Sequence, residues 1–156
     1  MNPPPKTELL EVGLRSARGR LDDARLAMVD GEEKRPQQLL VSASLAEVLW
    51  WCVAFDDALG GHRRHVGGYA SALGYSFRFA RNAMSHGEEP WEAARSGLTF
   101  PIRWPISWGW HWIDMPEPAG TGMAFRRDQW LAYSTTLVGH DIDATLDDYG
   151  RELLRL

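Results

Sequence analysis

Cysteine is almost absent from this chain of 156 residues, in which Cys52 stands alone. One cysteine cannot form an intramolecular disulfide, and it cannot anchor a cysteine-based metal cluster. Residues 1–6, which read MNPPPK, lack the apolar core of a secretory signal peptide. We therefore expect a reducing, cytoplasmic location, where disulfides are rare.

Long uncharged apolar runs are lacking as well. The longest stretch with little charge, Leu45 to Phe55, is too short to cross a bilayer and still contains Glu47, so we expect no membrane segment. Apolar residues make up 44% of the chain and charged residues 24%, which argues against a mainly disordered protein. The length favours a single domain over residues 1–156.

Acidic residues are missing from one segment, residues 60–87, although the whole chain carries a net charge of −4. The overall charge argues against a general nucleic-acid binder. The segment nevertheless holds a local excess of basic groups: Arg63, Arg64, Arg78, Arg81, His62, His65 and His86. Such an excess attracts phosphate, unless four arginines merely cluster on a solvated face.

Three long stretches before residue 87 repeat apolar residues at alternating spacings of four and three. This alternation places apolar side chains on one stripe of an α-helix. The joints between the stretches are short and contain glycine or proline, so neighbouring helices should be antiparallel. We therefore predict a mainly α, antiparallel up-down helical bundle. The stripes are Leu10, Leu14, Ala17, Leu21, Ala24 and Met28; Val41, Leu45, Val48, Cys52, Phe55 and Leu59; and Val66, Ala70, Leu73, Phe77, Ala80 and Met84.

The second stretch is apolar almost all round and is expected at the centre of the bundle, with Cys52 in the core, whereas the charged first stretch is expected at its edge. After Gly87 the period changes, because aromatic and apolar residues alternate from Phe100 to Trp112 as in a strand. Pro101 and Pro105 indicate an edge strand or a bent hairpin. Residues 88–126 should therefore form a tryptophan-rich, hairpin-like insertion before the C-terminal helices.

Two roles are open for the alternating tryptophans: packing of one hairpin face on the bundle, which is the commoner arrangement, or stacking on unpaired bases. Residues 114–124 are expected to form a loop, and a helical pattern resumes near Asp128. Gly139 interrupts it, and Asp141 or Asp143 is expected to N-cap the last helix.

The third helix ends in side chains that could handle a phosphate. Arg81 can bind a phosphate through two hydrogen bonds, His86 can act as an acid or a base, and Asn82 can orient either of them. Arg78 and Ser85 share a face with Arg81. Arg78 is either a second phosphate contact or an ordinary solvated arginine.

Structural alternatives are also open for His86 and for Glu47, a residue of the second stretch. His86 can be a plain cap that stabilises the helix dipole. Glu47 can orient Arg81 across the helix pair or simply face solvent. The spacing of His62 and His65 is loosely that of metal ligands, but no third ligand is near, so we expect a flexible loop there and neither a metal nor another cofactor.

Residues 81–86, which read RNAMSH, resemble the Arg-x4–6-His signature of the HEPN superfamily in its Arg-Asn-x3-His form. The similarity covers about residues 41–87, in which the stretch from Glu47 to Asp57 looks like the second helix of such proteins. The resemblance implies a helical bundle that forms a homodimer, with Arg81 and His86 of both subunits lining a shared cleft. Many members are metal-independent endoribonucleases of toxin–antitoxin, abortive-infection and other antiviral systems.

The resemblance also implies a mechanism. The RNA 2′-hydroxyl would attack the adjacent phosphate and leave a 2′,3′-cyclic phosphate and a 5′-hydroxyl. His86 would move the proton, Arg81 would stabilise the charge of the phosphorane, and Asn82 matches the polar residue that often follows the arginine. Arg78 and Ser85 are candidate RNA contacts, and an antitoxin or companion protein is a candidate partner. The alternative is a non-catalytic dimerisation module that binds a protein or RNA partner through the aromatic insertion.

The homodimer is expected to place the third helix near its two-fold axis. Arg81 and His86 are five residues apart, roughly 140° around an ideal helix, so the two groups converge only if the helix ends between them or if a second copy faces the first. Beyond its core stripe the helix has a second apolar face that could meet this copy, formed by Ala72, Tyr75, Phe79 and Ala83.

Overall fold

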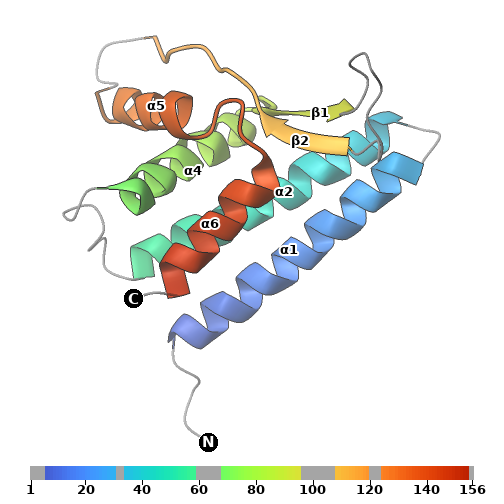
Figure 1. Cartoon of the computed structure of the whole chain (residues 1–156), viewed down its shortest axis with the longest axis horizontal. Coiled ribbons are helices and arrows are strands. Elements are labelled where there is room, and N and C mark those ends of the chain that lie inside the picture. Colours follow the sequence, from blue (N-terminus) through green and yellow to red (C-terminus); the bar gives the residue numbers. More distant parts are fainter. Residues whose placement is uncertain (1–5, 31–33, 59–67, 96–107, 120–123, 155–156) are drawn as a thin grey trace, which may run out of the picture.

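The computed structural model describes residues 6–30, 34–58, 68–95, 108–119 and 124–154. Within these ranges the chain is mainly helical, with one two-stranded antiparallel sheet, which confirms the predicted helical bundle with a hairpin (Figure 1). The elements are, in chain order, α1 (Lys6–Asp30), α2 (Lys34–Ala58), α4 (Tyr69–Ser85), β1 (Trp91–Arg95), β2 (Trp108–Trp112), α5 (Ala124–Thr136) and α6 (Ile142–Leu154).

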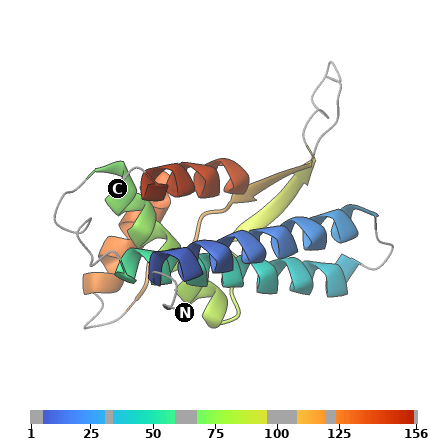
Figure 2. The same ribbon diagram turned by 90° about the horizontal axis from the view of Figure 1, so that it is seen from below.

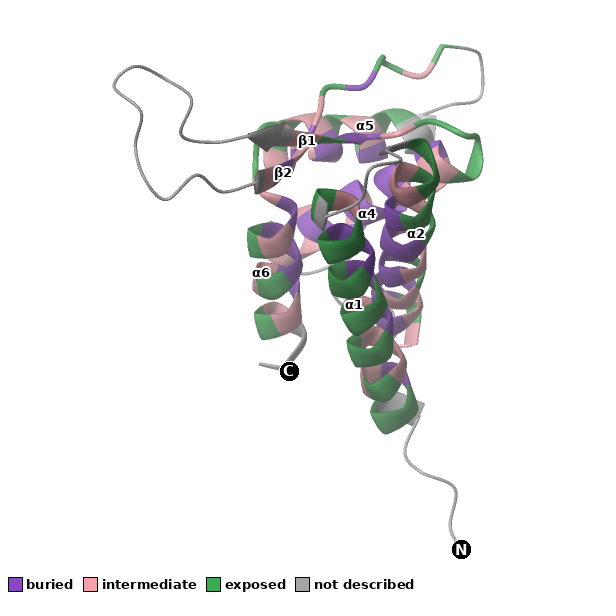
Figure 3. Ribbon diagram, turned by 90° about the vertical axis from the view of Figure 1, so that its right-hand side faces the viewer, coloured by how far each residue is buried: buried purple, intermediate pink, exposed green. Residues whose placement is uncertain are grey.

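The long helix α2 lies at the centre of the bundle, as predicted. It forms an antiparallel pair with α1 on one side and packs on α4 on the other (Figure 1). Its stripe from Val41 to Phe55 is buried, whereas α1 exposes a continuous outer face (Figure 3). The apolar stripes drive this order because each helix buries its stripe against a neighbour.

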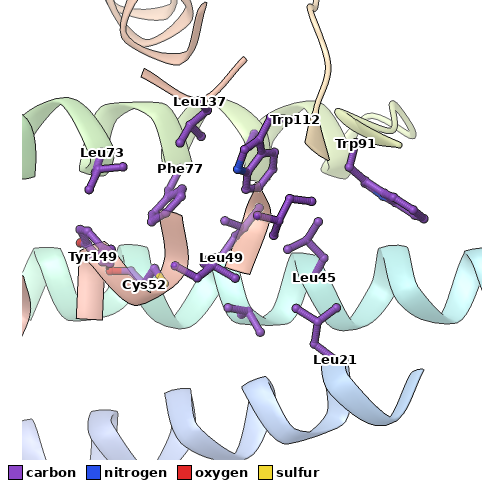
Figure 4. Packing of buried hydrophobic residues seen from close by; sticks show 14 of the residues in the cluster. Leu21, Leu45, Leu49, Cys52, Leu73, Phe77, Trp91, Trp112, Leu137 and Tyr149 are labelled. Carbon is purple, nitrogen blue, oxygen red and sulfur yellow. Dashed lines mark hydrogen bonds between the residues drawn. The ribbon is translucent and has the colours of Figure 1, made fainter. Parts of the chain in front are cut away.

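Apolar side chains from several elements meet between α2 and α4. Phe77 of α4 lies beside Tyr149 of α6, with ring centroids 5.0 Å apart, and beside Trp112 of β2 at 6.2 Å (Figure 4). The Tyr149 hydroxyl donates to the carbonyl oxygen of Cys52 at 3.2 Å, which joins α6 to the middle of α2. The predicted core position of Cys52 is confirmed.

The hairpin sits near the end of the bundle where α1 leads into α2 (Figure 2). Its register pairs Trp91 with Trp112 and Ala93 with Trp110. The sequence pattern predicted β2 but not β1, since the sequence WEAAR shows no clean alternation of apolar and polar residues. The rest of the predicted strand, including Pro101 and Pro105, lies outside the described residues.

Three tryptophans of the hairpin are packed on the bundle. Trp91, Trp110 and Trp112 are buried. The indole N–H of Trp112 donates to Thr145 Oγ1 at 2.9 Å, and that of Trp91 donates to Ser42 Oγ at 3.2 Å. Buried tryptophans require such acceptors. For these three residues the packing interpretation of the aromatic stripe is therefore confirmed.

Helix α6 runs alongside the α1–α2 pair (Figures 1 and 2). Asp141 provides its N-cap, because the Asp141 carboxylate accepts a hydrogen bond from the Ala144 N–H at 3.0 Å. Asp143, the other candidate cap, binds Arg18 at 2.9 Å and also pairs with Arg25. Asp141 thus caps the start of α6, whereas Asp143 joins α6 to α1.

One described helix is long and apolar enough to cross a membrane by length and composition alone. It is the segment Arg35–Ala58 of α2, with a mean hydropathy of 1.6 in its most apolar window, 44% of which is buried inside the protein. The core helix of a soluble protein meets the same criteria. The expectation of no membrane segment therefore stays a prediction.

Candidate functional site

The end of α4 forms a tight cap that presents His86 at the surface. Gly87 adopts a positive φ of 83°, its N–H donates to the Met84 carbonyl at 3.0 Å, and the Glu88 N–H donates to the Ala83 carbonyl at 3.1 Å. This pair of bonds is a Schellman motif, in which a glycine ends a helix without steric cost. The predicted termination at Gly87 is confirmed, and His86 is the exposed C-cap residue.

Arg81 lies one turn before this cap and is held by its neighbour. Its Nη2 donates to Asn82 Oδ1 at 2.9 Å, and both side chains are half-buried. Burial lowers the pKa of Arg81, the positive charge of Arg78 lowers it further, and the Asp57 carboxylate partly offsets both effects. The guanidinium thus bonds a neutral amide and is partly desolvated, which strengthens its attraction for an anion.

Ser85 is exposed, but its hydroxyl proton is already used. Ser85 Oγ donates to the carbonyl oxygen of Asn82 at 2.7 Å, a bond within the last turn of α4. Side chains of this kind commonly bond to a carbonyl in the preceding turn. In this arrangement Ser85 offers an approaching RNA an acceptor oxygen rather than a proton.

Arg78 has a role different from the predicted RNA contact. It is buried, and its Nη2 lies 2.7 Å from both Asp56 Oδ2 and Asp57 Oδ1 at the end of α2. Burial alone would lower the pKa of Arg78, but the hydrogen bonds to the two carboxylates raise it above its ordinary value. The guanidinium therefore joins α2 to α4 and is neutralised there.

Glu47 also differs from its predicted orienting role. Its carboxylate accepts two hydrogen bonds from Arg20 of α1, at 2.9 Å from Nε and 2.5 Å from Nη2. The hydrogen bond from Arg20 is the main reason that the pKa of Glu47 is lowered. Glu47 thus links α2 to α1, on the other side of α2 from the helix that carries Arg81.

A cavity of about 280 Å³ opens directly beside His86. Its walls come from the end of α4, from the segment that follows β2, and from α5. The residues that line it are Phe79, Asn82, Ala83, His86, Glu88, Pro116, Glu117, Pro118, Ala119 and Gln129. Two of the three residues of the predicted catalytic set, Asn82 and His86, line this half-open cavity, whereas Arg81 does not.

Gln129 is a buried polar residue of this cavity that no motif in the sequence indicated. It is only 2% exposed, and its Oε1 has no hydrogen-bond partner within the described part of the chain. A signal for it exists in the sequence, since Gln129, Tyr133 and Leu137 are spaced by four along α5 and all three are buried. A glutamine in a buried stripe requires a partner, because an unpaired buried amide is costly.

The second apolar face of α4, predicted to lie at the dimer axis, is partly covered within the subunit. Phe79 and Ala83 are buried, and the ring of Phe79 lies 5.0 Å from that of Tyr133 in α5. These two residues therefore contribute to the core between α4 and α5. Ala72 and Tyr75, the other two residues of the predicted face, are half-buried, so contact with a second copy through them stays a prediction.

The outer face of α2 remains open at a position bordering Arg81. Trp50 is 53% exposed and lies seven residues before Asp57, on the same face of α2. Asp57 in turn pairs with Arg78, and its negative charge raises the pKa of Arg81. This face of α2 therefore lies beside the motif. Apolar or small residues continue along it without being fully buried: Leu39, Ala43, Ala46, Trp50 and Ala54.

A larger cavity, of about 660 Å³, lies between α1, α2 and α6, away from the motif. Leu14, Val48 and Cys52 are among its apolar lining residues. The basic and acidic residues at its rim are equal in number, and some of them pair with each other, such as Arg15 with Glu11 at 2.8 Å. The larger cavity has three arginines in its lining, Arg15, Arg18 and Arg151, whereas the smaller cavity has Asn82 and His86 of the motif but no arginine.

Metal ligands do not cluster in the described part of the chain, where no group of three or more His, Cys, Asp or Glu side chains could hold an ion. His62 and His65 lie outside that part. Comparison with known proteins adds no relative, since no family model, no curated protein and no solved structure matches the chain.

Proposed function

We propose that the protein is a metal-independent endoribonuclease of the HEPN type, in which Arg81 and His86 are the catalytic residues. The observation that carries the proposal is the end of α4. There a half-buried guanidinium held by Asn82 precedes an exposed imidazole at the helix C-cap. Transfer of the RNA 2′-hydroxyl to its own phosphate requires a cation and an acid–base group. His86, the acid–base group of this pair, lines the cavity, and Arg81 is bonded to Asn82, which also lines it.

In the proposed reaction the 2′-hydroxyl oxygen attacks the neighbouring phosphorus and the bond to the 5′-oxygen breaks. His86 takes the proton of the 2′-hydroxyl in its neutral form or delivers a proton to the leaving oxygen in its charged form. Arg81 stabilises the added negative charge of the phosphorane, and Asn82 keeps the guanidinium in place. The products are a 2′,3′-cyclic phosphate and a 5′-hydroxyl.

A homodimer belongs to this proposal, because one subunit supplies only one guanidinium and one imidazole. The outer face of α2 that borders Arg81 is the surface best suited to a second copy. It exposes Trp50 and Leu39 along a stripe of small residues. Because a two-fold interface uses the same patch of both subunits, an assembly through this face would place the motif of each subunit next to the interface.

A role in a toxin–antitoxin, abortive-infection or antiviral system is part of the proposal, because it follows from the HEPN resemblance. In such a system an antitoxin or companion protein would restrain the enzyme. The alternative is an interaction module that acts through the aromatic insertion. Three tryptophans of that insertion, Trp91, Trp110 and Trp112, are buried and so do not favour it.

The proposal is tested by incubating purified protein with RNA in the presence of EDTA. The parent should cleave and leave 2′,3′-cyclic phosphate ends. Arg81→Ala and His86→Ala should each lose about 10²–10⁴-fold in rate, the usual cost of removing a general base or a charge-stabilising group. Each should lose no more than about 1–2 kcal/mol of stability, as is usual for surface and cap positions.

Arg15→Ala is the matched control, because Arg15 is an exposed arginine of α1 that pairs only with Glu11 among the described residues. It should cleave like the parent. Strict dependence on added magnesium would reject the metal-independent mechanism. Parental cleavage by both Arg81→Ala and His86→Ala would show that these are ordinary helix-end residues and would favour the interaction module.

A further inference from the structure

The cavity beside His86 contains more polar groups than the cleavage chemistry uses. Asn82 and His86 belong to the proposed catalytic set, but Gln129, Glu88 and Glu117 also line it and none of them has a role in moving a proton or holding a phosphate. The Glu117 carboxylate is paired with Arg127 at 2.8 Å. Glu88 is an exposed carboxylate at the mouth, whereas Gln129 is almost fully buried. Carboxylates repel phosphate, so this part of the cavity suits a different portion of the substrate.

We propose that this cavity is a base-recognition pocket that accepts a guanine base next to the cleaved phosphate. The proposal rests on the proposed function for its RNA substrate, but the binding itself does not require cleavage. The carrying observation is Gln129, whose Oε1 is buried without a partner in the described structure. A ligand that donates a hydrogen bond to this oxygen would remove the cost of leaving it unpaired.

The available groups match guanine better than the other bases. Gln129 Oε1 and the Glu88 carboxylate are acceptors, and guanine presents adjacent N1–H and N2–H₂ donors to them. The amide nitrogen of Asn82 is a donor, because its oxygen already accepts from Arg81, and guanine offers O6 and N7 as acceptors. Adenine and cytosine each present one amino group, and uracil a single N–H.

The size and place of the cavity fit the same ligand. A volume of about 280 Å³ is just below the range of sites for whole drug-sized molecules, so it suits a single base better than a complete nucleotide. Phe79 supplies an aromatic wall. Since unpaired RNA bases are commonly read by hydrogen bonds to their edges in such pockets, the base would be splayed out of the strand.

Guanosine 3′-monophosphate is the probe, compared by calorimetric titration with the adenosine, cytidine and uridine 3′-monophosphates. We expect guanosine 3′-monophosphate to bind at least about tenfold more tightly than the others, the usual discrimination of a good pair of base contacts. Gln129→Leu, of similar volume, should abolish that preference. Gln37→Leu is the matched control, because Gln37 Oε1 is also buried without a partner in the described structure but does not line the cavity.

Thermal melting shows whether Gln129→Leu is folded. If it is not, Glu88→Gln provides the same test at an exposed position and should also reduce the preference for guanosine 3′-monophosphate. Equal binding of the four nucleotides, or no binding of any, overturns the proposal. So does an unchanged preference in a folded Gln129→Leu or in Glu88→Gln.

The proposal and the nuclease activity can fail separately. Selective binding of guanosine 3′-monophosphate that depends on Gln129, in a protein that cleaves no RNA, supports the pocket and rejects the enzyme. Cleavage with no preference for guanine, equal in the parent and in Gln129→Leu, supports the enzyme and overturns the pocket.

Discussion

The guanidinium of Arg78 on α4 lies 2.7 Å from the carboxylate of Asp56 on α2, and both side chains are buried. The pair joins the two central helices at a point one turn before Arg81. The Arg78 guanidinium also pairs with a second carboxylate, that of Asp57, which is half exposed. Either charge left alone at this contact between α2 and α4 would be buried without compensation.

Removal of one partner should therefore be costly. Arg78→Met should lower the free energy of unfolding by about 3–5 kcal/mol, since it leaves the Asp56 carboxylate buried and unpaired. Urea denaturation followed by circular dichroism measures the change. Arg15→Met, which removes an exposed arginine, should leave the unfolding midpoint nearly unchanged, and an equally small effect of Arg78→Met would show that the buried pair contributes little.

The Tyr133 hydroxyl should contribute to the stability of the cavity wall. It lies 3.0 Å from the Pro90 carbonyl oxygen and 2.5 Å from that of Ile113. Its one proton is therefore shared between a carbonyl before β1 and a carbonyl after β2. Burial, and to a lesser extent Asp114, raise its pKa, so the hydroxyl stays protonated at neutral pH. Tyr133→Phe should cost about 1–3 kcal/mol by leaving carbonyls unpaired.

Hydrogen exchange locates this effect. Tyr133→Phe should speed the exchange of the Ile113 amide, which donates to the Pro90 carbonyl at 3.1 Å. The Ala144 amide at the N-cap of α6 provides the internal comparison and should be little changed. Loss of protection at both amides to the same extent would indicate global destabilisation instead.

Cys52 should be chemically inert in the folded protein. Burial raises the pKa of its thiol to about 12, from an ordinary value of 9.0. The thiolate is the reactive form, so alkylation by iodoacetamide at pH 8 should be slow until the chain is unfolded in urea. Mass spectrometry follows the labelling, and equal rates in folded and unfolded protein would contradict the prediction.

The same shift gives Cys52 a defined effect on stability. Because the folded state holds the thiol proton more tightly than the unfolded state, this contribution is fully present below pH 9 and is lost as the pH rises toward 12. Comparison of the parent with Cys52→Ala across this range should show the parent losing stability more steeply. Parallel pH profiles of the two proteins would refute the shift.

The outer face of α2 should be the dimer surface. Trp50→Glu introduces a charge where 53% of the tryptophan is exposed, so it should convert the dimer to a monomer and reduce RNA cleavage without unfolding the chain. Sedimentation equilibrium at micromolar concentration measures the association. Leu26→Glu on α1, at a position 64% exposed, is the matched control and should remain dimeric. A monomeric parent would remove the dimer from the proposed function.

The helices and the end of α4 could be predicted because their signals are local. Stripes of apolar residues at spacings of four and three depend only on the pitch of the helix, and Gly87 ends α4 through its own conformational freedom. Strand β1 was missed because the five residues WEAAR carry no alternation of their own. They are ordered by pairing with β2, which is a contact between distant parts of the chain.

The sequence by itself determined the helical bundle, the central place of α2 and the positions of Arg81 and His86 at a helix end. Only the tertiary structure decided the use of the remaining charges. The four arginines of the acid-free segment suggested a phosphate-binding patch, but Arg78 meets two carboxylates that are 21 and 22 residues away in the sequence. A basic residue contributes positive charge to the protein surface only if the fold does not pair it with a carboxylate. For the same reason the buried amide of Gln129, 43 residues beyond His86 in the sequence, became visible beside it only in the fold.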